Sequence, residues 1–237
     1  MNPVLIIATS HGELGSSGRK TGLWLEEFVA IYSRFRHAGI TVTVATPRGG
    51  AVPIDPLSLK VPALSAEARR FIAYGDPALS RTGPLRLIGA NDFDAVFYPG
   101  GHGPMWDLAT DLVNARILGA FFACGKAVGA VCHGPAALLK ARKRNGYPVI
   151  HQRRVTGFSD AEERQSGLTE TVPFSLEERM KNAGGVYSHS EPWVRHVVVD
   201  GNLVTGQNPQ SSADVAEAML DLLKPAQIVL RRRLIQA

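Results

Sequence analysis

The segment AVGAVCHGP at residues 127–135 decides the predicted fold of this 237-residue chain. Its apolar run at 127–131 is typical of a strand buried on both faces, and Cys132 follows where that strand ends. Pro135 suits the first turn of a helix, because its missing N–H would have no partner there. A strand, a tight turn and a helix in direct succession form a nucleophile elbow, which exposes a side chain on a strained turn. We therefore expect Cys132 to be a reactive nucleophile, and we keep the alternative, an inert structural cysteine, for Cys124.

The segments around this elbow alternate between two patterns. Short apolar, β-branched runs typical of strands alternate with longer runs of helical period, which predicts an α/β fold with a mostly parallel sheet covered by helices. The predicted strands are 4–8, 40–45, 94–98, 127–131 and 155–158, with an antiparallel pair at 197–199 and 203–205. The predicted helices are 24–35, 108–124, 135–141, 176–183 and 211–223. Residues 51–90 are irregular and proline-bearing, and we expect one or two short helices there.

The composition is that of a globular protein, with 45% hydrophobic and 20% charged residues. No repeat, low-complexity stretch or linker divides the chain, so we expect one domain over 1–237 that ends in a basic tail at 225–237. Two cysteines exclude a disulfide framework. No apolar run reaches the roughly 18 residues of a membrane span. The first residues lack the basic start of a signal peptide, so we expect a cytoplasmic protein.

The net charge of +5 raises the question of nucleic-acid binding. The basic residues are scattered, and aromatic residues do not interleave with them as a stacking platform for bases would require. We therefore expect no nucleic-acid partner.

Five further motifs identify a family. AVCHGPAALL at 130–139 and YPGGHGPMWDL at 98–108 resemble the DJ-1/PfpI superfamily. Lys20-Thr21-Gly22 followed by Glu26-Glu27, VTGFSDAEE at 155–163 and DGNLVTGQNPQSS at 200–212 narrow the resemblance to its Hsp31-like branch. The resemblance covers residues 4–223 and implies the glutamine-amidotransferase-like fold of that superfamily, a flavodoxin-like three-layer sandwich.

The resemblance implies a catalytic triad. Cys132 would be the nucleophile and His133 the general acid and base. The triad acid follows a Gly-Phe-x-Asp run in relatives, which places it at Glu163, although the neighbouring Glu162 leaves this assignment ambiguous by one position.

A second acid and an oxyanion hole are also implied. Glu27 would lie under the nucleophile, with Glu26 turned to solvent, and the N–H groups of Gly101 and His133 would bind an oxyanion. His102 would line the substrate pocket. We expect burial to raise the pKa of Glu27, so that it donates a hydrogen bond to the thiol group. That hydrogen bond and the predicted helix N-terminus should lower the pKa of the nucleophile.

The function implied is that of a glyoxalase III-type D-lactate dehydratase. The enzyme would convert methylglyoxal or a similar 2-oxoaldehyde into the 2-hydroxy acid, D-lactate, through a Cys132 hemithioacetal, without glutathione and without a cofactor. We expect the chain to act as a homodimer. The spacing of His11, Glu13 and His102 fits no established ligand pattern, so we expect no metal requirement.

Three alternatives remain open. The first is a stress chaperone or deglycase in which Cys132 only senses oxidation. The second is a cysteine peptidase or amidase with the same triad. The third is a glutamine amidotransferase, because His189-Ser190-Glu191 matches the His-x-Glu that completes the triad of the class I enzymes.

Overall fold

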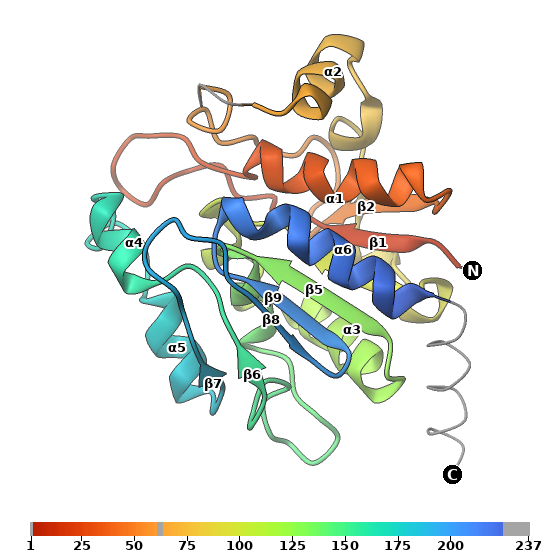
Figure 1. Ribbon diagram of the computed structural model, residues 1–237, viewed down its shortest axis with the longest axis vertical. Helices are drawn as coiled ribbons and strands as arrows, with labels where there is room; N and C mark the ends of the chain where they lie inside the picture. The colour runs from red at the N-terminus through yellow and green to blue at the C-terminus, as the bar shows by residue number, and fades with distance from the viewer. Residues whose placement is uncertain (1, 61–63, 225–237) are drawn as a thin grey trace.

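A computed structural model describes residues 2–60 and 64–224, and its centre is a seven-stranded sheet (Figure 1). The strand order is β3-β2-β1-β4-β5-β9-β8, and every neighbouring pair is parallel except β8 with β9. The strands are β1 (Val4–Ile7), β2 (Val42–Thr46), β3 (Gly83–Pro84), β4 (Ala95–Tyr98), β5 (Ala127–Val131), β8 (Val197–Asp200) and β9 (Leu203–Gly206). The predicted α/β fold with a mostly parallel sheet and an antiparallel edge pair is confirmed.

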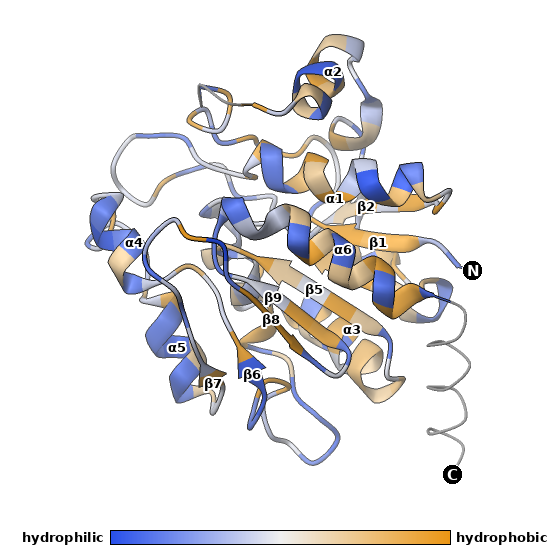
Figure 2. Cartoon of the chain, in the orientation of Figure 1, coloured by the Kyte–Doolittle hydropathy of each residue, from blue (hydrophilic) through white to orange (hydrophobic). Residues whose placement is uncertain are grey.

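Helices cover both faces of this sheet. Helices α1 (Leu25–His37) and α6 (Ser212–Leu223) pack against each other on one face, and α3 (Leu112–Ala123) lies on the other (Figure 1). The central strands are apolar along their length, helices α1 and α6 carry hydrophilic stretches, and α3 is largely apolar (Figure 2). The close approach of α6 to the sheet requires Gly129 in β5, because a Cβ there would lie 2.7 Å from the sulfur of Met219.

A smaller region lies beside the main sheet. Strands β6 (Arg154–Val155) and β7 (Val186–Tyr187) form a parallel pair, and α4 (Asp160–Gln165) and α5 (Leu176–Asn182) lie between them in the sequence. The irregular segment at 51–90 contains α2 (Ala66–Tyr74), whose N-terminus is capped by the Ser65 side chain. One α-helix in the described part of residues 51–90 agrees with the expectation for that segment.

Three predicted elements are shorter than the sequence suggests. The helix predicted at 135–141 is a 3-10 helix over Gly134–Leu138. The strand predicted at 155–158 ends at Val155, because the next N–H groups bond elsewhere, Thr156 to the Thr205 hydroxyl and Phe158 to the Cys132 carbonyl. The helix predicted from 108 begins at Leu112, where the Asp111 carboxylate caps it.

Two further predictions concern the basic tail and membrane spans. The basic tail predicted at 225–237 lies outside the described residues. Among the helices that the structure does describe, each is too short or too polar to cross a bilayer.

Candidate active site

Cys132 lies where β5 meets the 3-10 helix, and its backbone is strained. Its φ is +60°, a left-handed conformation that residues other than glycine adopt rarely. The Cys132 N–H donates to the Gly206 carbonyl of β9, and the Cys132 carbonyl accepts from Phe158 N–H, so both sides of the turn are fixed. This is the expected elbow. The thiol is not openly exposed, however, because Cys132 is only 3% accessible.

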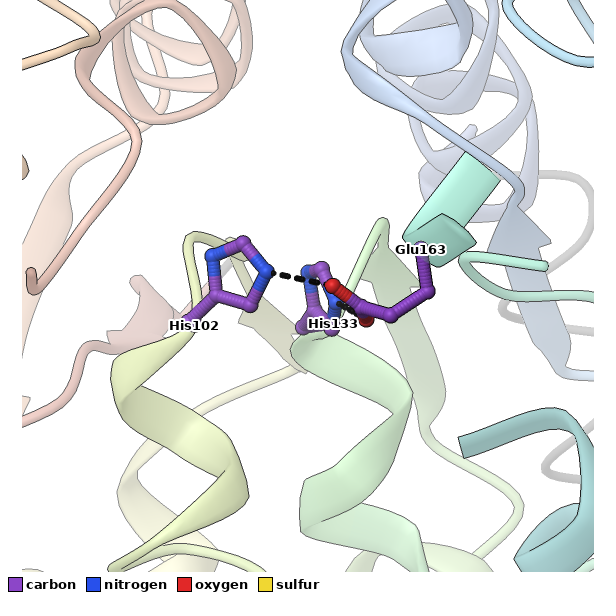
Figure 3. A group of neighbouring side chains, drawn as sticks. All are labelled: His102, His133 and Glu163. Carbon is purple, nitrogen blue, oxygen red and sulfur yellow. Dashed lines mark hydrogen bonds and ion pairs between the residues drawn. The ribbon is translucent and has the colours of Figure 1, made fainter. Parts of the chain in front are cut away.

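The side chains of His102, His133 and Glu163, which come from three separate segments of the chain, meet beside this turn (Figure 3). The Cys132 sulfur lies 3.4 Å from Nδ1 of His133. Nε2 of His133 lies 2.7 Å from one oxygen of Glu163, and Nε2 of His102 lies 2.9 Å from the other oxygen. One carboxylate therefore serves two histidines.

The pKa values of Glu163 and His133 determine where the protons of this cluster lie. Burial alone would raise the pKa of Glu163, but attraction to His133 and hydrogen bonds from both histidines hold it well below its usual range. Burial lowers the pKa of His133, as does the neighbouring His102, while Glu163 opposes them. An ionised carboxylate can only accept, so Nε2 of each histidine carries a proton, and His133, whose pKa is lowered, is neutral. Nδ1 of His133 then presents a lone pair to the Cys132 thiol.

Glu27 lies under the elbow from the first turn of α1, completely buried. One of its oxygens accepts the Gly100 N–H at 2.6 Å. Burial raises its pKa to about 8, opposed by its interactions with the Cys132 thiol and the Gly100 N–H. Glu27 is therefore protonated at neutral pH, in line with expectation. Glu26 points elsewhere, is half-buried, and accepts the N–H of Ser65.

The pKa of the Cys132 thiol differs from the prediction. Burial raises the pKa of Cys132, and Glu27 raises it further, although the N–H of Gly101 opposes them. The predicted lowering relied on a hydrogen bond from Glu27 and on a helix N-terminus. Glu27 instead raises the pKa, and the five-residue 3-10 helix that follows supplies only a short dipole. Cys132 is therefore a thiol in the resting site, and a neighbouring base must remove its proton.

The loop that faces the thiol is built from glycines for steric reasons. Gly101 has a φ of +81°, and a Cβ on it would lie 2.1 Å from the Gly22 carbonyl oxygen. A Cβ on Gly100 would lie 2.8 Å from both the Cβ of Cys132 and the backbone nitrogen of His133. The N–H of Gly101, one of the two groups expected to form an oxyanion hole, hydrogen-bonds the Cys132 sulfur.

Comparison with known proteins places this geometry in a family. The profile of the DJ-1/PfpI family matches residues 21–222. The chain belongs to the DJ-1/PfpI family. The Saccharomyces cerevisiae protein named Glutathione-independent glyoxalase HSP31 is 30% identical to it, over 93% of this chain and 98% of that protein.

Two crystal structures of similar proteins support this membership. That of the Francisella tularensis Rapid Encystment Protein 24 kDa has a TM-score of 0.88 at 37% identity, and it covers 93% of this chain and 98% of its own. That of glyoxalase III from Candida albicans has a TM-score of 0.85 at 29% identity, with 93% and 96% covered. The predicted family, its Hsp31-like branch and the flavodoxin-like fold are thereby confirmed.

In this DJ-1/PfpI protein, the two adjacent acids of α4 point in different directions. Glu163 faces the histidines, whereas one oxygen of Glu162 accepts the N–H and hydroxyl of Ser159. The other oxygen of Glu162 accepts the Trp193 N–H at 2.9 Å and the Asn208 amide at 2.8 Å. Glu162 thus holds two loops against α4 and contacts neither histidine.

Sequence reasoning missed two aromatic neighbours of the site. The Phe158 ring lies 4.3 Å from that of His133, and the Trp193 ring lies 5.6 Å from that of Phe158. Trp193 also has a left-handed backbone, with φ of +65°. The Ser-x-x-Glu capping box at 159–162 predicts α4 and could have located this region.

The structure does not bring the other candidate histidines into the site. His189 is exposed, and its Nδ1 donates to the Ser190 carbonyl oxygen at 2.9 Å. Glu191 is also exposed. His11 bonds to the Glu13 carbonyl and stacks on Trp106.

Proposed function

We propose that this protein converts methylglyoxal, or a similar small 2-oxoaldehyde, into the 2-hydroxy acid D-lactate without glutathione. Relatives that match nearly the whole chain are named Glyoxalase 3 or Glutathione-independent glyoxalase, which supports an enzyme of the glyoxalase III type. The observation that carries the proposal is the 3.4 Å contact between the Cys132 sulfur and Nδ1 of His133, whose other nitrogen is bonded to Glu163.

In the first step, the Cys132 sulfur attacks the aldehyde carbon. His133 Nδ1 accepts the thiol proton as the carbon–sulfur bond forms, so a protonated thiol poses no obstacle. The aldehyde oxygen gains negative charge, which the N–H groups of Gly101 and His133 stabilise, and protonation gives the hemithioacetal.

In the second step, the hydrogen of the former aldehyde carbon moves to the adjacent ketone carbon. His133 removes it as a proton, which leaves an enediolate whose negative charge lies on the former ketone oxygen. His133 returns that proton to the ketone carbon, and the proton of the C1 hydroxyl passes to the C2 oxygen as the C1 carbonyl forms. The product is a 2-hydroxy thioester of Cys132. Water cleaves the carbon–sulfur bond, releasing D-lactate and restoring the thiol, so no oxidant or reductant is consumed.

Glu163 and Glu27 organise these proton transfers. The carboxylate keeps the His133 proton on Nε2 and stabilises the imidazolium that forms when Nδ1 accepts a proton. Glu27, protonated at neutral pH, donates to the sulfur as it gains charge.

The test is lactate formation from methylglyoxal in buffer without glutathione, with the product assayed by a D-lactate-specific dehydrogenase. We expect turnover by wild type and none by Cys132→Ala. Cys124→Ala is the matched control, because Cys124 is the exposed cysteine outside the site, and it should retain wild-type turnover. Equal loss in both variants, or full activity in Cys132→Ala, would contradict the proposal.

A further inference from the structure

The arrangement of His102, His133 and Glu163 contains more ligand atoms than the proposed reaction uses. That reaction needs one histidine on Glu163, yet His102 makes an equivalent hydrogen bond to the second carboxylate oxygen (Figure 3). One ligand atom from each of the three residues lies within 4.8 Å of the others. All three side chains are buried, which fixes their positions, and the rings of the two histidines lie 4.0 Å apart.

We propose that His102, His133 and Glu163 form a binding site for Zn²⁺ or a similar divalent transition metal, and that the bound ion inhibits the enzyme. Two imidazole nitrogens with one carboxylate suit zinc and the other first-row transition metals. Ca²⁺ and Mg²⁺ prefer oxygen ligands, so we expect them to bind poorly. Three protein ligands leave further coordination positions for water.

Inhibition follows from the positions of the two protons. In the metal-free site, Nε2 of each histidine donates to Glu163, and Nδ1 of His133 faces the thiol with its lone pair. A metal needs the Nε2 lone pair, so a neutral His133 must then carry its proton on Nδ1. That nitrogen can no longer accept the Cys132 proton. Metal binding and thiol activation are therefore mutually exclusive at His133.

Two of the three proposed ligand residues are slightly exposed. His102 is 9% and Glu163 is 6% exposed, whereas His133 is fully enclosed. The Cys132 sulfur contacts Nδ1, the nitrogen on the far side of the His133 ring from Glu163. The thiol is accordingly not a member of the proposed ligand set, and removing it should leave the metal site intact.

The binding experiment separates this site from thiol ligands. EDTA-treated Cys124→Ala/Cys132→Ala protein is titrated with ZnCl₂ by isothermal calorimetry, and we expect one ion per chain. Adding His102→Ala or Glu163→Gln should weaken binding at least tenfold. His189→Ala, which removes an exposed histidine outside the cluster, is the matched control and should bind as before. Unchanged affinity in the first two variants, or lost affinity in the control, overturns the site.

The inhibition experiment rests on the proposed function, whereas the calorimetry does not. Wild-type turnover of methylglyoxal should fall on addition of ZnCl₂ and return on addition of EDTA. The zinc concentration that halves activity should rise at least tenfold in His102→Ala, measured relative to that variant's own activity. An unchanged concentration would mean that zinc acts through the thiol and overturns the inhibitory role. If wild type shows no turnover at all, the proposed function fails and the calorimetry still decides the site.

Discussion

Two adjacent carboxylates, Glu162 and Glu163, show how closely a single site residue can be located from the sequence. Counting along a motif placed the triad acid within one position, but adjacent residues on a helix point about 100° apart, and spacing alone could not choose between them. The choice follows from the cap of α4, in which Glu162 is already bonded to Ser159. Glu163 is then free to face the histidines.

The roles of the adjacent and the distant histidine can be separated by substitution. His133→Ala should abolish lactate formation, since it removes the base at the sulfur, and His189→Ala should keep a rate near that of wild type because His189 is exposed. Both variants and wild type are assayed with methylglyoxal and with glutamine. Glutamine hydrolysis that depends on His189 and not on His133 would favour the amidotransferase alternative.

At the scale of elements, local sequence patterns identified the strands and helices but not where each one ends or whether a helix is of the 3-10 type. The apolar runs of β1, β4 and β5 were visible because strands buried on both faces need them. The 3-10 helix after Cys132 was not recognisable in the sequence, because its Pro and Ala residues also fit an α-helix. The short β6 was overestimated for a different reason, since Thr156 and Phe158 bond to distant groups that no local pattern shows.

Helix α4 links folding to the site, and its cap can be tested. Ser159→Ala removes the hydroxyl that caps α4 and bonds Glu162, so we expect a loss of about 1 kcal/mol of stability. Turnover should also fall several-fold, because α4 carries Glu163. Ser65→Ala removes the equivalent cap of the peripheral α2 and is the matched control. Chemical denaturation and steady-state kinetics of both variants would show this, and an equal effect on turnover would count against the link.

At the scale of the whole molecule, the sheet order brings together loops from distant parts of the sequence. Strands β4, β5 and β9 are neighbours, so the glycine loop, the elbow and the segment after Gly206 meet at one edge. The order of strands in a parallel sheet was predictable only through the family resemblance. The homodimer and the cytoplasmic location stay predictions.

The stability of the whole chain should depend on the protonation of Glu27. The unfolded chain ionises this residue near pH 4.5, whereas the folded chain keeps it protonated up to about pH 8. The unfolded state is therefore favoured increasingly as pH rises through this interval. Glu27→Gln cannot ionise, so its stability should exceed that of wild type progressively from pH 5 to pH 8, by on the order of a few kcal/mol.

Thermal unfolding at a series of pH values measures this difference. Glu26→Gln removes the neighbouring, half-buried carboxyl group and serves as the control. A gap between wild type and Glu27→Gln that stays constant with pH would show that Glu27 is not the group responsible.

At position 132, the left-handed backbone favours glycine for stability, whereas turnover requires the cysteine side chain. A residue with a side chain costs about 1 kcal/mol or more in this conformation, a cost that glycine would not incur. Random substitution followed by selection for thermal resistance alone should thus favour glycine at position 132. Selection for turnover should restore the cysteine each time, so the two regimes would drive this one position in opposite directions.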